Sequence, residues 1–125
     1  MQDEPTPTEL IKAVADFLRT EIVPAIKGHN AFKLRVGINA LDLVTRQIAL
    51  EGPADAAEAA RLKQVLGTDG SLMELNRALA EKIANGEVDL DTPGLKAHLW
   101  QTTMDKLAVD QPNYASYKRE LGNKT

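Results

Sequence analysis

The stretch Asn30–Leu50, NAFKLRVGINALDLVTRQIAL, decides the fold that we expect for this chain. Wound as a helix at about 100° per residue, its apolar side chains spread over roughly 260° of the circumference. A helix that is apolar almost all round is normally buried by neighbours on several sides. The sequence therefore predicts a central helix at Asn30–Leu50, enclosed by other helices.

A thin polar line interrupts this apolar surface. It consists of Arg35, Asn39, Asp42 and Arg46, whose spacing of four, three and four residues keeps them on one helix face. Three interpretations stay open: a solvent-facing strip in which Asp42 pairs with Arg46, a buried network that fixes helix register, or a ligand site. In the third, the two arginines hold an anion such as a carboxylate or a phosphate. These four residues are therefore the candidate ligand-binding site.

Start signals predict further helices on either side of the central one. Thr6-Pro7-Thr8-Glu9 and Ser71-Leu72-Met73-Glu74 each offer a hydroxyl cap followed three residues later by a glutamate, which is the capping-box pattern. Thr92-Pro93 repeats the cap and proline of the first helix and predicts the start of the last one. These signals place helices near the beginning, middle and end of the chain.

Proline and glycine predict where the helices end. Pro24 predicts a break after the first helix, and Gly52-Pro53 predicts that the central helix ends and an Ala-rich helix over Ala54–Leu66 begins. No pair of alternating apolar and polar segments suggests strands. We therefore expect an all-α fold, a single-domain bundle of about five helices around a central helix. The domain spans residues 1–125, with residues 1–5 and 118–125 as frayed ends.

Composition excludes several classes of protein. The chain has 125 residues, of which 43% are hydrophobic and 26% charged, as in a globular domain with a core of its own. A net charge of -3 argues against nucleic-acid binding, which needs clustered basic residues. The absence of cysteine excludes disulfides and thiolate metal sites. With neither a secretory signal nor a membrane-spanning run in the sequence, we expect a soluble cytoplasmic protein that does not bind a membrane.

Motifs of catalysis and of cofactor binding are missing from the sequence. It has no Gly-rich phosphate loop, no Gly-x-Ser-x-Gly elbow and no His-Glu-x-x-His. His29 and His98 are the two histidines, too few for a three-histidine metal site. The sequence therefore favours a non-enzymatic protein with no catalytic residues, cofactor or metal. The enzymatic alternative places His98 or His29 across the bundle from a carboxylate.

The C-terminal part of the chain carries the candidate partner-docking residues. They are Trp100, Gln111, Pro112, Tyr114 and Tyr117. Aromatic residues are enriched at protein interfaces, and basic residues follow these tyrosines. The alternatives are that Trp100 belongs to the core and that the tail caps the bundle.

Four segments together carry a family resemblance. They are PTPTELIKAVADFL (Pro5–Leu18), AFKLRVGINAL (Ala31–Leu41), LGTDGSLMELNRALAEKIANGEVDL (Leu66–Leu90) and DKLAVDQPNY (Asp105–Tyr114). The chain resembles an uncharacterised family of small bacterial proteins whose genes commonly neighbour those of acyl-CoA dehydrogenases and of aminoglycoside- or choline-type phosphotransferases. The resemblance implies an accessory or interaction module linked to acyl-CoA metabolism, working as a homodimer or with a neighbouring-gene enzyme. The second hypothesis is a protein that binds an anionic or acyl metabolite through Arg35 and Arg46.

Overall fold

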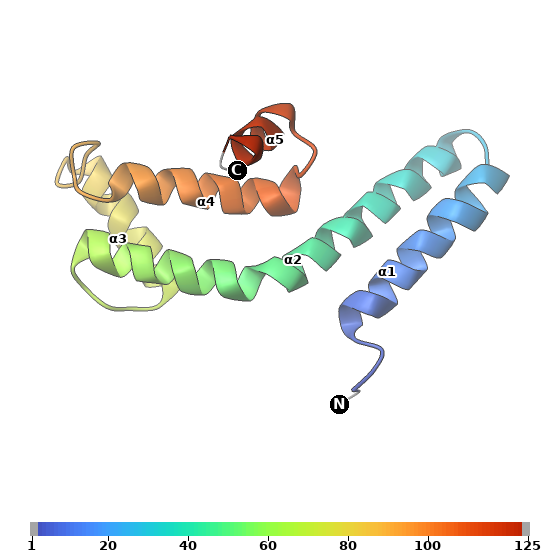
Figure 1. Cartoon of the computed structure of the whole chain (residues 1–125), viewed down its shortest axis with the longest axis horizontal. Helices are drawn as coiled ribbons and strands as arrows, with labels where there is room; N and C mark the ends of the chain where they lie inside the picture. Colours follow the sequence, from blue (N-terminus) through green and yellow to red (C-terminus); the bar gives the residue numbers. More distant parts are fainter. Residues whose placement is uncertain (1–2, 124–125) are drawn as a thin grey trace. The chain divides into compact units, whose positions relative to one another are not determined.

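The computed structural model describes residues 3–123. Within this range the chain forms five α-helices and no strand, which confirms the predicted all-α class (Figure 1). The helices are α1 (Pro7–Phe17), α2 (His29–Leu66), α3 (Leu72–Ala84), α4 (Leu95–Asp110) and α5 (Ala115–Gly122). A π-helical turn, η1 (Leu18–Ile22), and a 3-10 turn, η2 (Val23–Ala25), follow α1 and confirm the break predicted at Pro24.

Capping boxes begin α1 and α3 as the sequence predicts. The Thr6 backbone N–H donates to Glu9 Oε2 at 2.8 Å, and the Glu9 backbone N–H donates to Thr6 Oγ1 at 3.3 Å. Ser71 and Glu74 make the same pair of hydrogen bonds at 2.8 and 3.2 Å. Each box satisfies backbone donors that have no partner inside the first helical turn.

The predicted cap at Thr92-Pro93 is wrong. Helix α4 begins at Leu95, after Gly94 in the left-handed conformation with φ of 88°. The Thr92 hydroxyl instead accepts a hydrogen bond of 3.0 Å from the Asp89 backbone N–H, which closes a turn before the helix. Glycine suits this position because other residues adopt positive φ at a steric cost.

The predicted helix boundary at Gly52-Pro53 is also wrong. Helix α2 runs for 38 residues from His29 to Leu66, with Pro53 inside it. Proline removes one intrahelical hydrogen bond and costs about 3 kcal/mol in a helix interior. The Ala-rich segment after Pro53 has high helix propensity, which favours continuation of the helix on that side.

The chain divides into two compact units, Met1–Leu50 and Glu51–Thr125, and the boundary falls within α2. Unit 1 is a helical hairpin in which α1 and the first part of α2 lie side by side (Figure 1). Unit 2 contains the rest of α2 with α3, α4 and α5. Cooperative folding of the chain as a single domain stays a prediction.

Within unit 1, the segment Asn30–Leu50 is only partly buried, and its enclosure on several sides stays a prediction. Ile38 and Ala31 are buried, and so is Ala15 of α1. Five large apolar side chains of this segment are nevertheless 41–61% exposed: Phe32, Val36, Val44, Ile48 and Leu50. Within unit 1, α1 covers one face of this segment.

Unit 2 holds the hydrophobic core of the chain. Its buried members come from α2, α3, α4 and the α3–α4 connection: Leu62, Leu75, Leu79, Val88 and Leu95. Tyr117 of α5 is also buried. The sequence predicts that the chain frays from residue 118 onward, but residues 118–122 belong to α5. Residues 1–2 and 124–125 of the predicted frayed ends lie outside the described residues.

Candidate functional site

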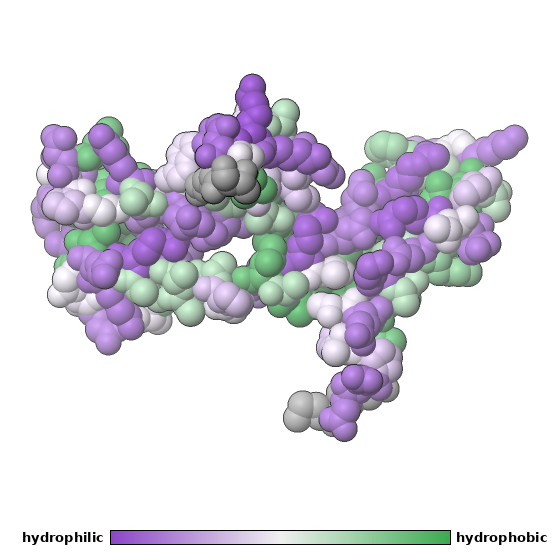
Figure 2. All heavy atoms as spheres, in the orientation of Figure 1, coloured by the Kyte–Doolittle hydropathy of each residue, from purple (hydrophilic) through white to green (hydrophobic). Residues whose placement is uncertain are grey.

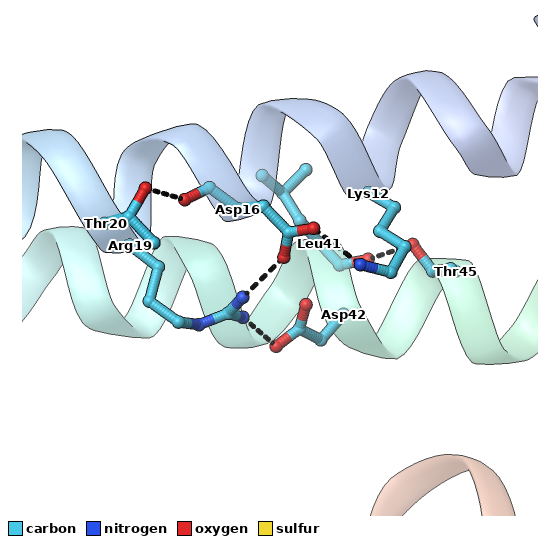
Figure 3. Close-up of polar contacts among 7 residues, drawn as sticks. All are labelled: Lys12, Asp16, Arg19, Thr20, Leu41, Asp42 and Thr45. Atoms are coloured by element: carbon cyan, nitrogen blue, oxygen red, sulfur yellow. Dashed lines mark hydrogen bonds and ion pairs between the residues drawn. The ribbon is translucent and has the colours of Figure 1, made fainter.

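Charged side chains of α1 and η1 form a network that reaches α2 along one side of the hairpin (Figure 3). The Arg19 guanidinium donates to Asp42 Oδ2 at 2.6 Å and to Asp16 Oδ1 at 2.9 Å. Lys12 Nζ donates to Asp16 Oδ2 at 2.5 Å. The hydrogen bond from Lys12 and the nearby charge of Arg19 hold the pKa of Asp16 below its ordinary value. Asp42, a member of the predicted polar line, is thus tied to the first helix.

A cavity of about 250 Å³ lies beside this network within unit 1. It is lined by Arg19, Val23, Arg35, Ile38 and Asn39. Arg35 and Asn39, two of the four predicted ligand residues, therefore share a cavity. Arg35 is exposed and forms no hydrogen bond or ion pair within residues 3–123. Arg46, the fourth predicted residue, is half-buried and does not line the cavity.

Sequence reasoning missed Arg19 as a member of this site. In the sequence it appears as a charge on the polar face of an amphipathic helix. The spacing of Lys12, Asp16 and Arg19 by four and three residues is a signal of helix-surface ion pairs. This spacing does not show which residue of another helix accepts a hydrogen bond from the Arg19 guanidinium.

A second polar cluster lies in unit 2, where α2 and α4 bring distant residues together. Arg61 Nη2 of α2 lies 3.5 Å from Asp105 Oδ2 and 3.4 Å from Thr102 Oγ1, both on α4. Gln101 Nε2 donates to Asp105 Oδ1 at 2.8 Å. These side chains are half-buried, so the Arg61–Asp105 ion pair is partly shielded from water.

His98 is the buried polar residue beside this cluster, with 2% of its surface exposed. Burial lowers the pKa of the imidazole, and the charge of Arg61 lowers it further, while Glu58 acts in the opposite direction. His98 is therefore neutral at pH 7. No carboxylate within residues 3–123 forms an ion pair with His98 or accepts a hydrogen bond from its ring.

Two buried nitrogen atoms in this region have no hydrogen-bond partner among the described residues, Arg61 Nε and His98 Nδ1. A buried polar group left unpaired costs about 1–3 kcal/mol. Both residues line a cavity of about 380 Å³ within unit 2. Nothing in the local sequence indicates this cavity, because Arg61 and His98 lie on helices separated by α3 and a connection.

The predicted docking residues differ in their exposure. Trp100 and Tyr114 are both 51% exposed. Gln111 is exposed as well, and Pro112 is half-buried. Tyr117 is buried, which leaves its aromatic face largely inside unit 2. Docking of a partner at these residues stays a prediction.

The model of one protein family, DUF6285, a domain of unknown function, matches residues 24–114. The chain belongs to this family. No curated protein and no solved structure matches the chain. Membership of DUF6285 therefore identifies the chain as a member of an uncharacterised family and transfers no activity to it.

The DUF6285 match contains both polar clusters except for Lys12, Asp16 and Arg19, which α1 and η1 contribute. All of α2, α3 and α4 lie within it, including Arg35, Arg61 and His98. Within residues 3–123, no helix is both long enough and apolar enough to span a membrane. In the same part of the chain, no group of three or more His, Cys, Asp or Glu residues is placed to hold a metal ion.

Proposed function

We propose that this DUF6285 protein is a non-enzymatic interaction module that pairs with a second copy of itself through the hairpin of unit 1. The observation that carries the proposal is a set of half-exposed apolar side chains on both helices of the hairpin. We call this set the apolar side; it consists of Leu10, Val14, Phe17, Val44 and Ile48, which are 42–54% exposed. On the face drawn in Figure 2, hydrophobic residues, in green, reach the surface of the hairpin beside hydrophilic ones.

Helical winding places the apolar side opposite the charged network. On α1, Leu10, Val14 and Phe17 fall within about 60° of one another and roughly 140–160° from the direction of Lys12. On α2, Val44 and Ile48 point away from the side on which Asp42 meets Arg19, by the same winding. The hairpin thus has one charged side and one uncharged apolar side.

The exposed area of the apolar side favours its burial in a protein–protein interface. Soluble monomers rarely expose a contiguous apolar patch larger than a few hundred Å². The half-exposed side chains of the apolar side leave on the order of 400 Å² open, about half of the ~800 Å² per partner that a standard interface buries. Two hairpins that meet through their apolar sides would form a four-helix bundle, a symmetric arrangement that buries the same surface of both copies.

The mass of the protein in solution tests this pairing. Sedimentation equilibrium at about 100 μM is expected to give twice the chain mass of 13.6 kDa. Val44→Glu places an unpaired charge in the interface and is expected to weaken the dimer at least about 100-fold, since a buried unpaired charge costs several kcal/mol. Val36→Glu is the matched control, because Val36 is 52% exposed on the same helix but lies outside the apolar side. A wild-type monomer at this concentration, or equal weakening by the two variants, would contradict the proposal.

The second candidate function is the binding of a small anion in unit 1, favoured by the cavity that Arg35 and Asn39 line. Arg19 is occupied by two carboxylates, whereas Arg35 has its guanidinium available. A thermal-shift titration with phosphate and with hexanoate is expected to raise the unfolding temperature of the wild type. Arg35→Gln is expected to abolish that shift, and a shift that survives Arg35→Gln would remove this candidate. Arg46→Gln tests in the same way whether Arg46, the fourth residue of the polar line, takes part in anion binding.

A more specific version of this proposal includes a link to acyl-CoA metabolism. We propose a bacterial, cytoplasmic accessory protein that serves a neighbouring-gene enzyme such as an acyl-CoA dehydrogenase. Its support is the resemblance of the sequence segments described above and the absence of cysteine. Half-exposed Trp100 and Tyr114 are the residues that such a partner would contact.

A further inference from the structure

Asn85 and Gly86 close the C-terminal end of α3 and form the one asparagine–glycine pair in the sequence. Gly86 has the left-handed conformation with φ of 76°. Both residues are exposed, and a Cβ placed on Gly86 would meet no atom within 4 Å. The side-chain amide of Asn85 and the backbone nitrogen of Gly86 are therefore neighbours in the chain, at a place that water reaches.

An asparagine followed by glycine has an internal reaction open to it. The backbone nitrogen of the glycine attacks Cγ of the asparagine and loses its proton to water, and a five-membered succinimide forms as ammonia leaves. Glycine favours this ring because it has no Cβ to crowd the attacking nitrogen. Water then opens the ring. Cleavage of the bond between the nitrogen and Cγ gives aspartate, and cleavage of the bond to the backbone carbonyl gives isoaspartate, in which the chain runs through Cβ.

The other asparagines lack a glycine after them. They are Asn30, Asn39, Asn76, Asn113 and Asn123. The Cβ of the following residue hinders attack by the backbone nitrogen at each of them. Asn76 is held further, because its amide donates to Glu58 Oε1 at 2.8 Å and to the Leu72 carbonyl at 3.2 Å.

Asp69 and Gly70 give an internal comparison, since an aspartate before glycine reaches the same succinimide by loss of water. Lys63 Nζ lies 2.9 Å from Asp69 Oδ1, and the Gly70 backbone N–H donates to the same oxygen at 2.7 Å. These contacts hold the pKa of Asp69 below its ordinary value, so the group is an ionised carboxylate. A carboxylate resists attack by a nitrogen because it is already negatively charged, whereas Asn85 offers a neutral amide.

The last turn of α3 controls access to this reaction. The Gly86 backbone N–H donates to the Ile83 carbonyl at 3.1 Å, and Asn85 keeps helical φ and ψ of -84° and -4°. The nitrogen has to leave this hydrogen bond and turn toward Cγ of Asn85 before it attacks. Helix ends open locally at a much lower free energy than the whole domain unfolds. The folded chain therefore slows the reaction without blocking it.

We infer that Asn85 is a site of spontaneous deamidation and that its products weaken the connection between α3 and α4. The backbone N–H groups of Glu87 and Val88 donate to the Lys82 carbonyl at 2.9 and 3.2 Å, and Val88 belongs to the core of unit 2. An aspartate in place of Asn85 puts a negative charge at the C-terminal end of a helix, where the helix dipole opposes it. Isoaspartate adds a backbone atom to the turn that positions Val88. The inference goes beyond the proposed dimer, which uses unit 1.

Peptide mapping of the full-length protein after incubation in warm, mildly alkaline buffer tests the site. Asn85 is expected to gain about 1 Da, the change from amide to acid, at least about tenfold faster than any other asparagine. The reaction at Asn85 is expected to run at least about tenfold faster in guanidinium chloride, which frees the Gly86 nitrogen. Isoaspartate, detected by enzymatic methylation, is expected at the position of Asn85 and not at Asp69. Asn85→Gln is the matched control, since its longer side chain would need a six-membered ring, and it is expected to abolish the main acidic form.

Two charge variants test the effect of the product. Asn85→Asp supplies one product directly and is expected to lower the urea midpoint of unfolding. Asn113→Asp adds the same charge at an exposed residue of unit 2 just before α5, and it is expected not to lower the midpoint. Equal midpoints of the two variants would overturn the effect on the connection.

Mapping of the wild type decides the site without any variant. A folded chain that shows no reaction at Asn85, or a faster reaction at another asparagine, would overturn the assignment of the site. Equal rates at Asn85 in the folded and the denatured protein would show that the last turn of α3 does not control the reaction.

Discussion

Replacing Leu62 by alanine is expected to destabilise the protein by about 2–5 kcal/mol, the range found when a fully buried leucine is truncated. Leu62 is fully buried and packs in the core of unit 2 with Leu75, Leu79 and Leu95. The variant loses the transfer free energy of the removed methyl groups and leaves a cavity that the surrounding helices fill incompletely. Domains of this size have a free energy of unfolding on the order of 10 kcal/mol, so the loss is a large fraction of the whole.

Urea unfolding of the wild type and of Leu62→Ala measures this loss, at one fixed protein concentration because a dimer would add to the apparent stability. Leu90→Ala is the matched control, since Leu90 is 62% exposed in the same unit and its truncation is expected to cost within about 0.5 kcal/mol. A cost for Leu62→Ala below about 1 kcal/mol, or equal costs for the two variants, would show that unit 2 is not organised around this core.

The same measurement tests the predicted single domain. Trp100 lies on α4 and reports on unit 2 by fluorescence, whereas circular dichroism reports on all helices. In a single cooperative domain the two signals change together, and Leu62→Ala shifts both. If the units unfold separately, part of the helical signal will stay where it is in the wild type when the Trp100 transition moves.

Local sequence signals predicted local structure well. The capping boxes at Thr6 and Ser71 form as expected because each depends on residues within four positions of one another. The fold class follows in the same way from helical periodicity without strand patterns. Gly52-Pro53 failed as a boundary because proline suits the first turn of a helix and is also tolerated, at a cost, inside one. The choice between these positions depends on packing beyond the local sequence.

The width of an apolar surface did not predict what covers it. Asn30–Leu50 is apolar over most of its circumference, a pattern that predicts several helical neighbours within the chain. In unit 1 the segment has α1 on one face, and Val36 and Val44 stay half-exposed. The periodicity of apolar residues indicates how much apolar surface of a helix needs to be buried. A second copy of the chain can bury this surface as well as another helix of the same chain can.

The candidate sites show the same limit of sequence-based prediction, which does not give the contacts between helices. Spacing placed Arg35 and Asn39 on one helix face, and the structure places both at one cavity. Spacing could not place Arg19 beside Asp42 or Arg61 beside Asp105, because each pair joins two helices whose relative position the sequence alone does not give. Residues far apart in the chain were found together only through the packed structure.

The stability of the protein is expected to fall as the pH is lowered from about 7.5 to about 5.5, and His98 is the reason. Burial and the charge of Arg61 keep the pKa of His98 below the 6.5 of a free histidine in the folded state. The unfolded chain therefore takes up the proton first as the pH falls. By linkage, the stabilisation is fully present above about 6.5 and is lost as the pH falls from there through the folded-state pKa.

His98→Gln removes the titrating ring, and its urea midpoint is expected to vary with pH less than that of the wild type over this range. His29→Gln, at an exposed position at the start of α2, is the control for a histidine substitution outside unit 2. Asp16, Asp69 and Glu74, whose pKa values are lowered by their hydrogen bonds, stay ionised down to about pH 5.5 and do not contribute in this window.

An NMR titration of the two imidazoles in the folded wild type gives a second readout, which does not depend on the folding of any variant. The His98 signal is expected to change at lower pH than a free histidine does. If His98 titrated at or above 6.5, or if His98→Gln kept the full pH dependence, then the imidazole would not be held neutral between α2 and α4.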